Sequence, residues 1–119
     1  MKVRFLLDEH ISPAIQLGLK QRLPQVDVLC VGDPGAPPLG TPDPDILHFL
    51  QATQRALVTM NRRSMWQHVV EQWQIGGHLW GVFWVPRDIG YGALIRQLLL
   101  IWDTSEAEEW LDQLRDLPF

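Results

Sequence analysis

The stretch KVRFLLDEHISP, residues 2–13, combines an apolar run, two carboxylates, a histidine and a helix start. Its first half alternates and then becomes fully apolar, which is typical of a strand buried in a parallel sheet. Ser12 and Pro13 are a hydroxyl cap followed by proline at the first helical position. The stretch therefore predicts a strand that passes directly into a helix, with Asp8 at the point where the strand ends.

The same order recurs along the chain. Apolar runs predict further strands at 26–31, 56–59 and 79–85, and helical patterns predict helices at 13–23, from about Asp43 to Leu50, at 64–75 and at 90–102. SEAE at 105–108 matches a capping box, which predicts a last, acidic helix that begins at Ser105. Strict alternation of strands and helices predicts an α/β fold, a three-layer α/β/α sandwich with a central parallel four-stranded sheet and right-handed crossovers.

Length and composition set the class of protein. The 119 residues fit a single domain, residues 1–119, and the 46% hydrophobic and 20% charged residues are typical of a globular chain. Cys30 is the single cysteine, so no internal disulfide can form. Only three apolar residues separate Arg4 from Asp8, too few for a signal peptide, and no apolar run is long enough to cross a bilayer. We therefore expect a cytoplasmic protein with no membrane partner.

The negative charge is concentrated in one part of the chain. The net charge is −4, and residues 103–116 hold six acids against one base. The rest of the chain holds nine bases and eight acids and is close to neutral. This distribution argues against a general DNA-coating role but leaves room for a local basic site, for which NRRSM at 61–65 is the best candidate.

Three polar side chains are candidate metal ligands. Asp8 follows the first strand and Asn61 the third, so they meet at one edge of the sheet if these strands are neighbours. Asp45 lies near the start of the second helix, at the buried edge of its apolar stripe. Carboxylate and amide oxygens suit Mg²⁺. The structural alternative is that Asp8 only marks the helix entry, and that Asp43 and Asp45 complement the dipole of their helix, with Asp43 as its cap.

Arg62, Arg63 and Ser64 form a candidate anion site at the start of the third helix. Guanidinium groups and the free amides of a helix N-terminus both favour phosphate, so this segment is a candidate for RNA binding. Ser64 is also the predicted cap of that helix. The alternative is a pair of solvated arginines in a turn.

The six tryptophans allow three uses: base stacking, core packing and a subunit interface. Core packing and a homodimer face are the commoner uses of such residues, and the apolar run at 79–85 makes a homodimer plausible.

A resemblance to a known family adds to this interpretation. The segments FLLDEHISPAIQLGL, DVLCVG, DPDILHFL, RALVTMNRRSM and GGHLWGVFWV, in this order, resemble a compact bacterial group of PIN-like proteins over residues 2 to about 100. The resemblance implies a PIN-like fold and a ribonuclease that depends on Mg²⁺ or Mn²⁺. Many PIN domains are toxins of toxin–antitoxin pairs, so it also implies a small helix-turn-helix antitoxin as a partner.

The resemblance also assigns roles to residues. Asp8 matches the first acid of the family and Asp45 the second, while Asn61 stands where a third acid is usual and Ser64 where a fourth often lies. The implied site is therefore catalytic through Asp8, Asp45 and Asn61, which also hold the metal. Because two of the usual carboxylates are absent, we expect one ion rather than two.

Two other functions remain open. The first is a catalytically inactive PIN-like module that binds RNA or a protein partner through its arginines, its acidic end and its tryptophans. The second is a receiver-like phosphoacceptor, which needs an aspartate at the end of the third strand and a lysine after a later one. Thr59, Met60 and Asn61 end the third strand here, and the only lysines are Lys2 and Lys20, so this function is the least favoured.

Overall fold

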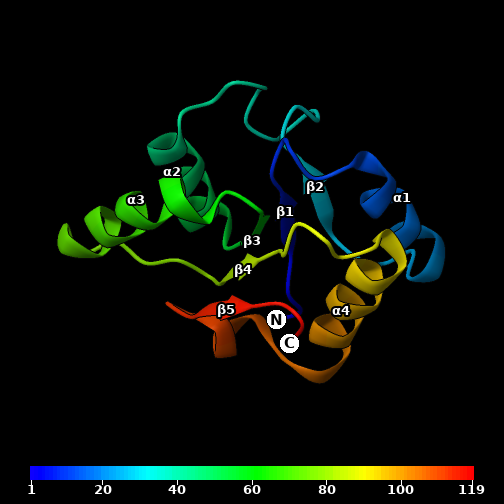
Figure 1. The fold of residues 1–119 in the computed structure, drawn as a ribbon. Helices are drawn as coiled ribbons and strands as arrows, with labels where there is room; N and C mark the ends of the chain where they lie inside the picture. Colours follow the sequence, from blue (N-terminus) through cyan, green and yellow to red (C-terminus); the bar gives the residue numbers. More distant parts are fainter.

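The computed structural model describes residues 1–119 (Figure 1). Its elements, in chain order, are β1 (Phe5–Leu7), α1 (Pro13–Arg22), β2 (Val28–Cys30), α2 (Asp43–Thr53), β3 (Ala56–Thr59), α3 (Arg62–Gln74), β4 (Val82–Trp84), α4 (Tyr91–Thr104), the 3₁₀ helix η1 (Ala107–Trp110) and β5 (Leu114–Asp116). Strand β3 has the predicted bounds, whereas β1, β2 and β4 are shorter than the apolar runs that predict them.

The five strands form one parallel sheet in the order β2-β1-β3-β4-β5. The predicted α/β class and the parallel sheet are thus confirmed, but the predicted count of four strands is wrong because β5 extends the sheet beyond β4. β1 is an interior strand that pairs with β2 on one side and β3 on the other. The carboxyl ends of β1 and β3 are therefore neighbours, as expected.

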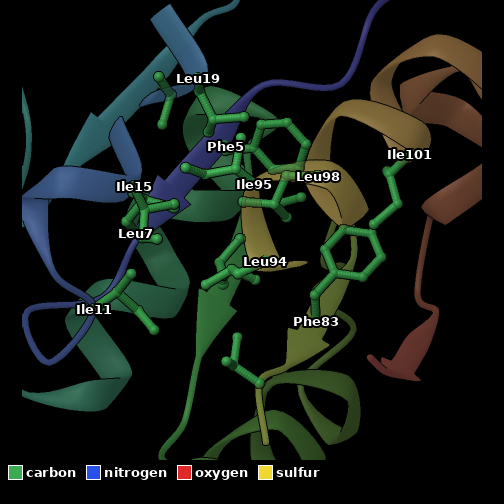
Figure 2. Close-up of a cluster of buried hydrophobic side chains, with 14 of the residues drawn as sticks. Phe5, Leu7, Ile11, Ile15, Leu19, Phe83, Leu94, Ile95, Leu98 and Ile101 are labelled. Carbon is green, nitrogen blue, oxygen red and sulfur yellow. The ribbon is translucent and has the colours of Figure 1, made fainter. Parts of the chain in front are cut away.

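The side chains of each strand divide between two buried clusters. Phe5 and Leu7 of β1 belong to a cluster that also holds the apolar faces of α1 and α4, whereas Leu6 belongs to a second cluster with α2 and α3. This alternation is a property of extended chain, whose successive side chains point to opposite faces of a sheet. Figure 2 shows the first cluster, in which side chains from α1 and α4 meet those of β1 and β4.

Gly18 lets α1 and α4 pack closely. A Cβ atom at this position would lie 2.4 Å from Cδ1 of Ile95, closer than any real contact. Helices α1 and α4 lie side by side in Figure 1, on the opposite side of the sheet from α2 and α3.

The last crossover has a different hand from the first three. The connections β3–α3–β4 and β4–α4–β5 both step toward the same edge of the sheet, yet α3 and α4 cover opposite faces. Their hands are therefore opposite, so the prediction of right-handed crossovers fails for this last connection; about 98% of such connections are right-handed. As a result, α4 packs against α1. A right-handed connection would have placed it on the α2–α3 face, over β4 and β5.

The acidic helix predicted from Ser105 does not form. Its residues make the four-residue helix η1 and then strand β5. The capping box is present one position later, between Glu106 and Glu109, while the Ser105 hydroxyl accepts a hydrogen bond of 2.7 Å from Nε1 of Trp110. Trp110 is buried edge-on against Phe83 at 4.9 Å, and this contact turns the chain toward the sheet.

Helix α3 begins three residues earlier than predicted, when the cap residues are compared. Its N-cap residue is Asn61, and Ser64 lies in the first turn instead of capping it. Pro42, and not Asp43, is the N-cap residue of α2, so Asp43 and Asp45 both lie in the first turn, where acids favour the helix dipole. None of the helices has the length and apolar composition needed to cross a membrane.

Candidate functional site at the β3–α3 junction

Asp8 is a buried carboxylate at the carboxyl end of β1. The residue is only 8% exposed. Its backbone N–H donates a 3.0 Å hydrogen bond to the carbonyl of Val58, which extends the pairing of β1 with β3 by one residue. Oδ2 accepts a 2.7 Å hydrogen bond from the hydroxyl of Thr59, and Oδ1 accepts one of 2.9 Å from the backbone N–H of Glu9. Two neutral donors thus hold a buried acid in one orientation, with no cation beside it.

This carboxylate lies where the chain reverses its direction across the sheet. From β1 the chain steps to β2, whereas from β3 it steps the other way to β4, so the helices that follow cover opposite faces. A crevice forms at such a point because the two connections diverge, and it is the usual ligand position in open parallel sheets. Asp8 follows β1 and Thr59 ends β3, the two adjacent strands at this point.

Residues 59–64, TMNRRS, link β3 to α3 and form what we call the β3–α3 junction. The hydroxyl of Thr59, while donating to Asp8, accepts a 3.0 Å hydrogen bond from the backbone N–H of Asn61. Asn61 is half-buried, and its side chain makes no hydrogen bond within the chain. Its amide is therefore free to bind a ligand or a water molecule.

The second carboxylate in contact with the junction is Asp43. The Ser64 hydroxyl donates to its Oδ2 at 3.2 Å, and Asp43 is half-buried. Asp45, the residue favoured by the sequence, is exposed, and its side chain makes no hydrogen bond or ion pair. The junction thus contacts Asp8 through Thr59 and Asp43 through Ser64.

Arg62 and Arg63 line a groove of about 630 Å³ on the other side of the junction. Its remaining walls are Trp66, Trp84, Leu114 and Asp116. The guanidinium of Arg62 lies 5.8 Å from the ring centre of Trp84 and forms an ion pair with Asp116 of β5. Arg63 forms no ion pair and is exposed. The groove therefore combines aromatic walls with one free and one paired cation.

A further hollow of about 520 Å³ adjoins Asn61 and is also lined by His10, Met60 and Arg87. Arg87 lies three residues after the end of β4, and this position soon after a strand was the signal that could have identified it. Glu9 is exposed, and its Oε1 accepts a 3.4 Å hydrogen bond from the backbone N–H of Gly40 in the proline-rich loop. Glu9 therefore turns toward that loop and does not join Asp8 as a second acid.

The donor set can be compared with the needs of a metal ion. No group of three or more His, Cys, Asp or Glu side chains comes together, which argues against zinc and against a pair of ions. Mg²⁺ and Mn²⁺ prefer oxygen, and Mg²⁺ is held by one or two carboxylates while it keeps several waters. The carboxylates of Asp8 and Asp43 and the amide of Asn61 supply oxygen atoms of the kind that such an ion prefers.

The sequence did not identify the groove residues Trp66, Trp84 and Asp116 as site residues. Trp66 lies four positions after Arg62 on α3, so the two share a helix face, which is a signal that the sequence carries. Asp116 has no such signal, because it reaches the groove only through the pairing of β5 with β4, in which it lies opposite Trp84.

Comparison with protein-family models, with curated proteins and with solved structures found no significant match to this chain.

Proposed function

We propose that this chain is a PIN-like domain with a three-layer α/β/α fold that binds single-stranded RNA and cleaves it with one Mg²⁺ or Mn²⁺ ion. The observation that carries the proposal is the β3–α3 junction, a single six-residue segment that contacts Asp8 and Asp43 through hydroxyl groups and presents an unpaired amide and two arginines, of which Arg62 is paired with Asp116. The resemblance of the LLDE and LVTMNRRSM segments to PIN-like proteins supports the same function.

The chain's own residues have distinct parts in this proposal. Asp8 supplies a fixed negative charge, because the Thr59 hydroxyl and the Glu9 N–H hold both of its oxygens. Asn61 supplies a neutral oxygen, and Asp43 a second carboxylate that Ser64 orients. Arg63, which has no acidic partner, attracts the phosphodiester group. When bound, a divalent ion lowers the pKa of a water molecule and stabilises charge on the leaving oxygen.

The proposal is tested by incubating end-labelled single-stranded RNA with the protein and Mg²⁺ or Mn²⁺. The wild type is compared with Asp8→Asn, and with Asp103→Asn as a matched loss of one exposed carboxylate at the end of α4. We expect cleavage by the wild type and by Asp103→Asn, none by Asp8→Asn, and none in EDTA. Equal cleavage by all three proteins would show a contaminating nuclease and would contradict the proposal.

A second candidate function is a catalytically inactive PIN-like module that binds RNA or a protein. It is favoured by Asn61, a neutral residue where a third acid is usual, and by the lack of any cluster of three metal-binding side chains. RNA binding by the wild type without cleavage in either metal would support this candidate over the first.

The resemblance further suggests that the protein is a toxin neutralised by a small helix-turn-helix antitoxin. If so, induction of the wild type arrests growth of a bacterial host, and Asp8→Asn, produced to the same level, does not. Arrest by both proteins would separate toxicity from cleavage and argue against a ribonuclease toxin.

A further inference from the structure

The groove beside α3 is an exposed part of the sheet face. α3 covers the α2–α3 face up to β4, but the reversed last crossover takes α4 to the opposite face. The floor of the groove is Trp84 of β4, which is only 5% exposed, and half-buried Leu114 of β5. The floor ends at the two arginines of the junction.

Trp66 is the exposed aromatic side chain of this groove. It is 49% exposed, an unusual state for so large an apolar side chain. Its ring is nevertheless held, because Trp73 packs edge-on against it at 6.3 Å and is itself fixed by a 2.9 Å hydrogen bond from its Nε1 to Asp112. A solvent-exposed ring that is already oriented loses little conformational freedom when a base stacks on it.

The charges at the rim select the ligand. Arg63 carries no ion pair, whereas Arg62 is paired with Asp116, and both members of that pair are exposed, at 62% and 64%. An exposed pair of this kind contributes little to folding, so its loss does not endanger the structure. A phosphate that approaches Arg62 must displace the carboxylate of Asp116, which therefore competes with anionic ligands.

We infer that this groove is a nucleotide subsite, in which a base of single-stranded RNA stacks on Trp66 and its phosphate binds Arg63 and Arg62 in competition with Asp116. The inference deepens the proposed function and rests on it for the identity of the ligand. The subsite lies over β4 and β5, whereas Asp8 lies at the end of β1, so binding in the groove can be measured separately from cleavage.

Binding is measured by fluorescence anisotropy of a labelled uridine hexanucleotide in EDTA, at low and at moderate salt. We expect Trp66→Ala to weaken binding about tenfold, and Arg63→Gln to weaken it about threefold or more and to reduce its salt dependence. Asp116→Asn is expected to tighten binding, because it removes a competing negative charge. Arg96→Gln, an exposed arginine of α4, is the matched control and leaves binding unchanged.

Three outcomes would overturn the inference: no binding by the wild type, wild-type affinity in Trp66→Ala, or weaker binding in Asp116→Asn. Displacement of the RNA by a hexaglutamate peptide at similar concentration would also overturn it, since the groove would then select negative charge and not a base.

Asp8→Asn separates this inference from the proposed function. If Asp8→Asn binds the hexanucleotide normally and does not cleave RNA, both stand. If cleavage depends on Asp8 but the groove variants bind normally, the subsite is wrong and the nuclease remains. If the groove binds RNA and no protein cleaves it, the subsite remains and the nuclease is wrong.

Discussion

The hydroxyl of Thr59, at the end of β3, donates a 2.7 Å hydrogen bond to the buried carboxylate of Asp8, at the end of β1. Thr59 is fully buried, so this hydrogen bond is shielded from bulk solvent. The contact joins adjacent strands at the point where their connections diverge, and it fixes the acid on which the proposed site depends.

Thr59→Val is expected to lower the free energy of unfolding by about 1–3 kcal/mol, because it leaves a buried carboxylate oxygen without its donor. We also expect slower RNA cleavage, since Asp8 is no longer held. Thr59→Ser keeps the hydroxyl and serves as the control, with cleavage close to that of the wild type. Urea denaturation and the cleavage assay check both effects. Equal stability of the valine and serine variants would show that the bond contributes nothing.

Asp43 and Asp45 offer a direct comparison of structure with sequence. Asp43 contacts Ser64 of the junction, whereas Asp45 is exposed. We expect Asp43→Asn to reduce cleavage about tenfold or more, as loss of a residue that supports a metal site does, and Asp45→Asn to change it little. Both substitutions remove one first-turn acid from α2 and so change its interaction with the helix dipole alike, but only Asp43→Asn alters the partner of Ser64. The reverse order of effects would favour Asp45, the residue that the sequence predicts, as the second acid.

Asp112 makes stability depend on pH. Burial alone raises the pKa of this carboxyl, but hydrogen bonds from the backbone of Leu79, from His78 and from Trp73 outweigh burial and hold the pKa below its ordinary value of 3.8. A lowered pKa in the folded state contributes stability that is present above the ordinary value and is lost as the pH falls through the folded value.

We therefore expect Asp112→Asn to be less stable than the wild type near neutral pH, with the difference shrinking as the pH falls below about 4. Asparagine tolerates the left-handed backbone at this position, φ 56°, so the variant changes charge and hydrogen bonding with little strain. Chemical denaturation at several pH values measures the difference, and a constant difference across the range would contradict the assignment.

Gly81 allows η1 to pack against β4. Its φ is +107°, and a Cβ atom there would lie 3.0 Å from Cβ of Trp110. Gly81→Ala is expected to destabilise the fold by about 1–3 kcal/mol. Gly92→Ala, in the first turn of α4, meets only the movable guanidinium of Arg96 and is expected to stabilise by about 0.5–1 kcal/mol. Thermal unfolding compares the two, and a neutral Gly81→Ala would mean that Trp110 packs elsewhere.

The sequence by itself determined the elements that depend on local patterns. Apolar runs that end in polar residues predicted β1 and β3, and Ser12 with Pro13 predicted the start of α1, where Ser12 does accept a hydrogen bond from the N–H of Ala14. The parallel sheet followed from the alternation of strands and helices. The β3–α3 junction was also identified from sequence, because polar residues directly after a buried strand must emerge at its carboxyl end.

The tertiary structure alone decided what depends on distant contacts. The segment 105–116 carries a helical signal, yet Trp110 packs on Phe83 and Leu114 pairs with Val82, and these contacts override local propensity. The contact of Ser64 with Asp43, and not with Asp45, depended on which side chain faces Ser64, which spacing cannot tell. The groove arose because α4 crosses to the α1 face. The residues of α4 do not specify that face by themselves, because the residues that α4 packs against come from strands and helices far along the chain.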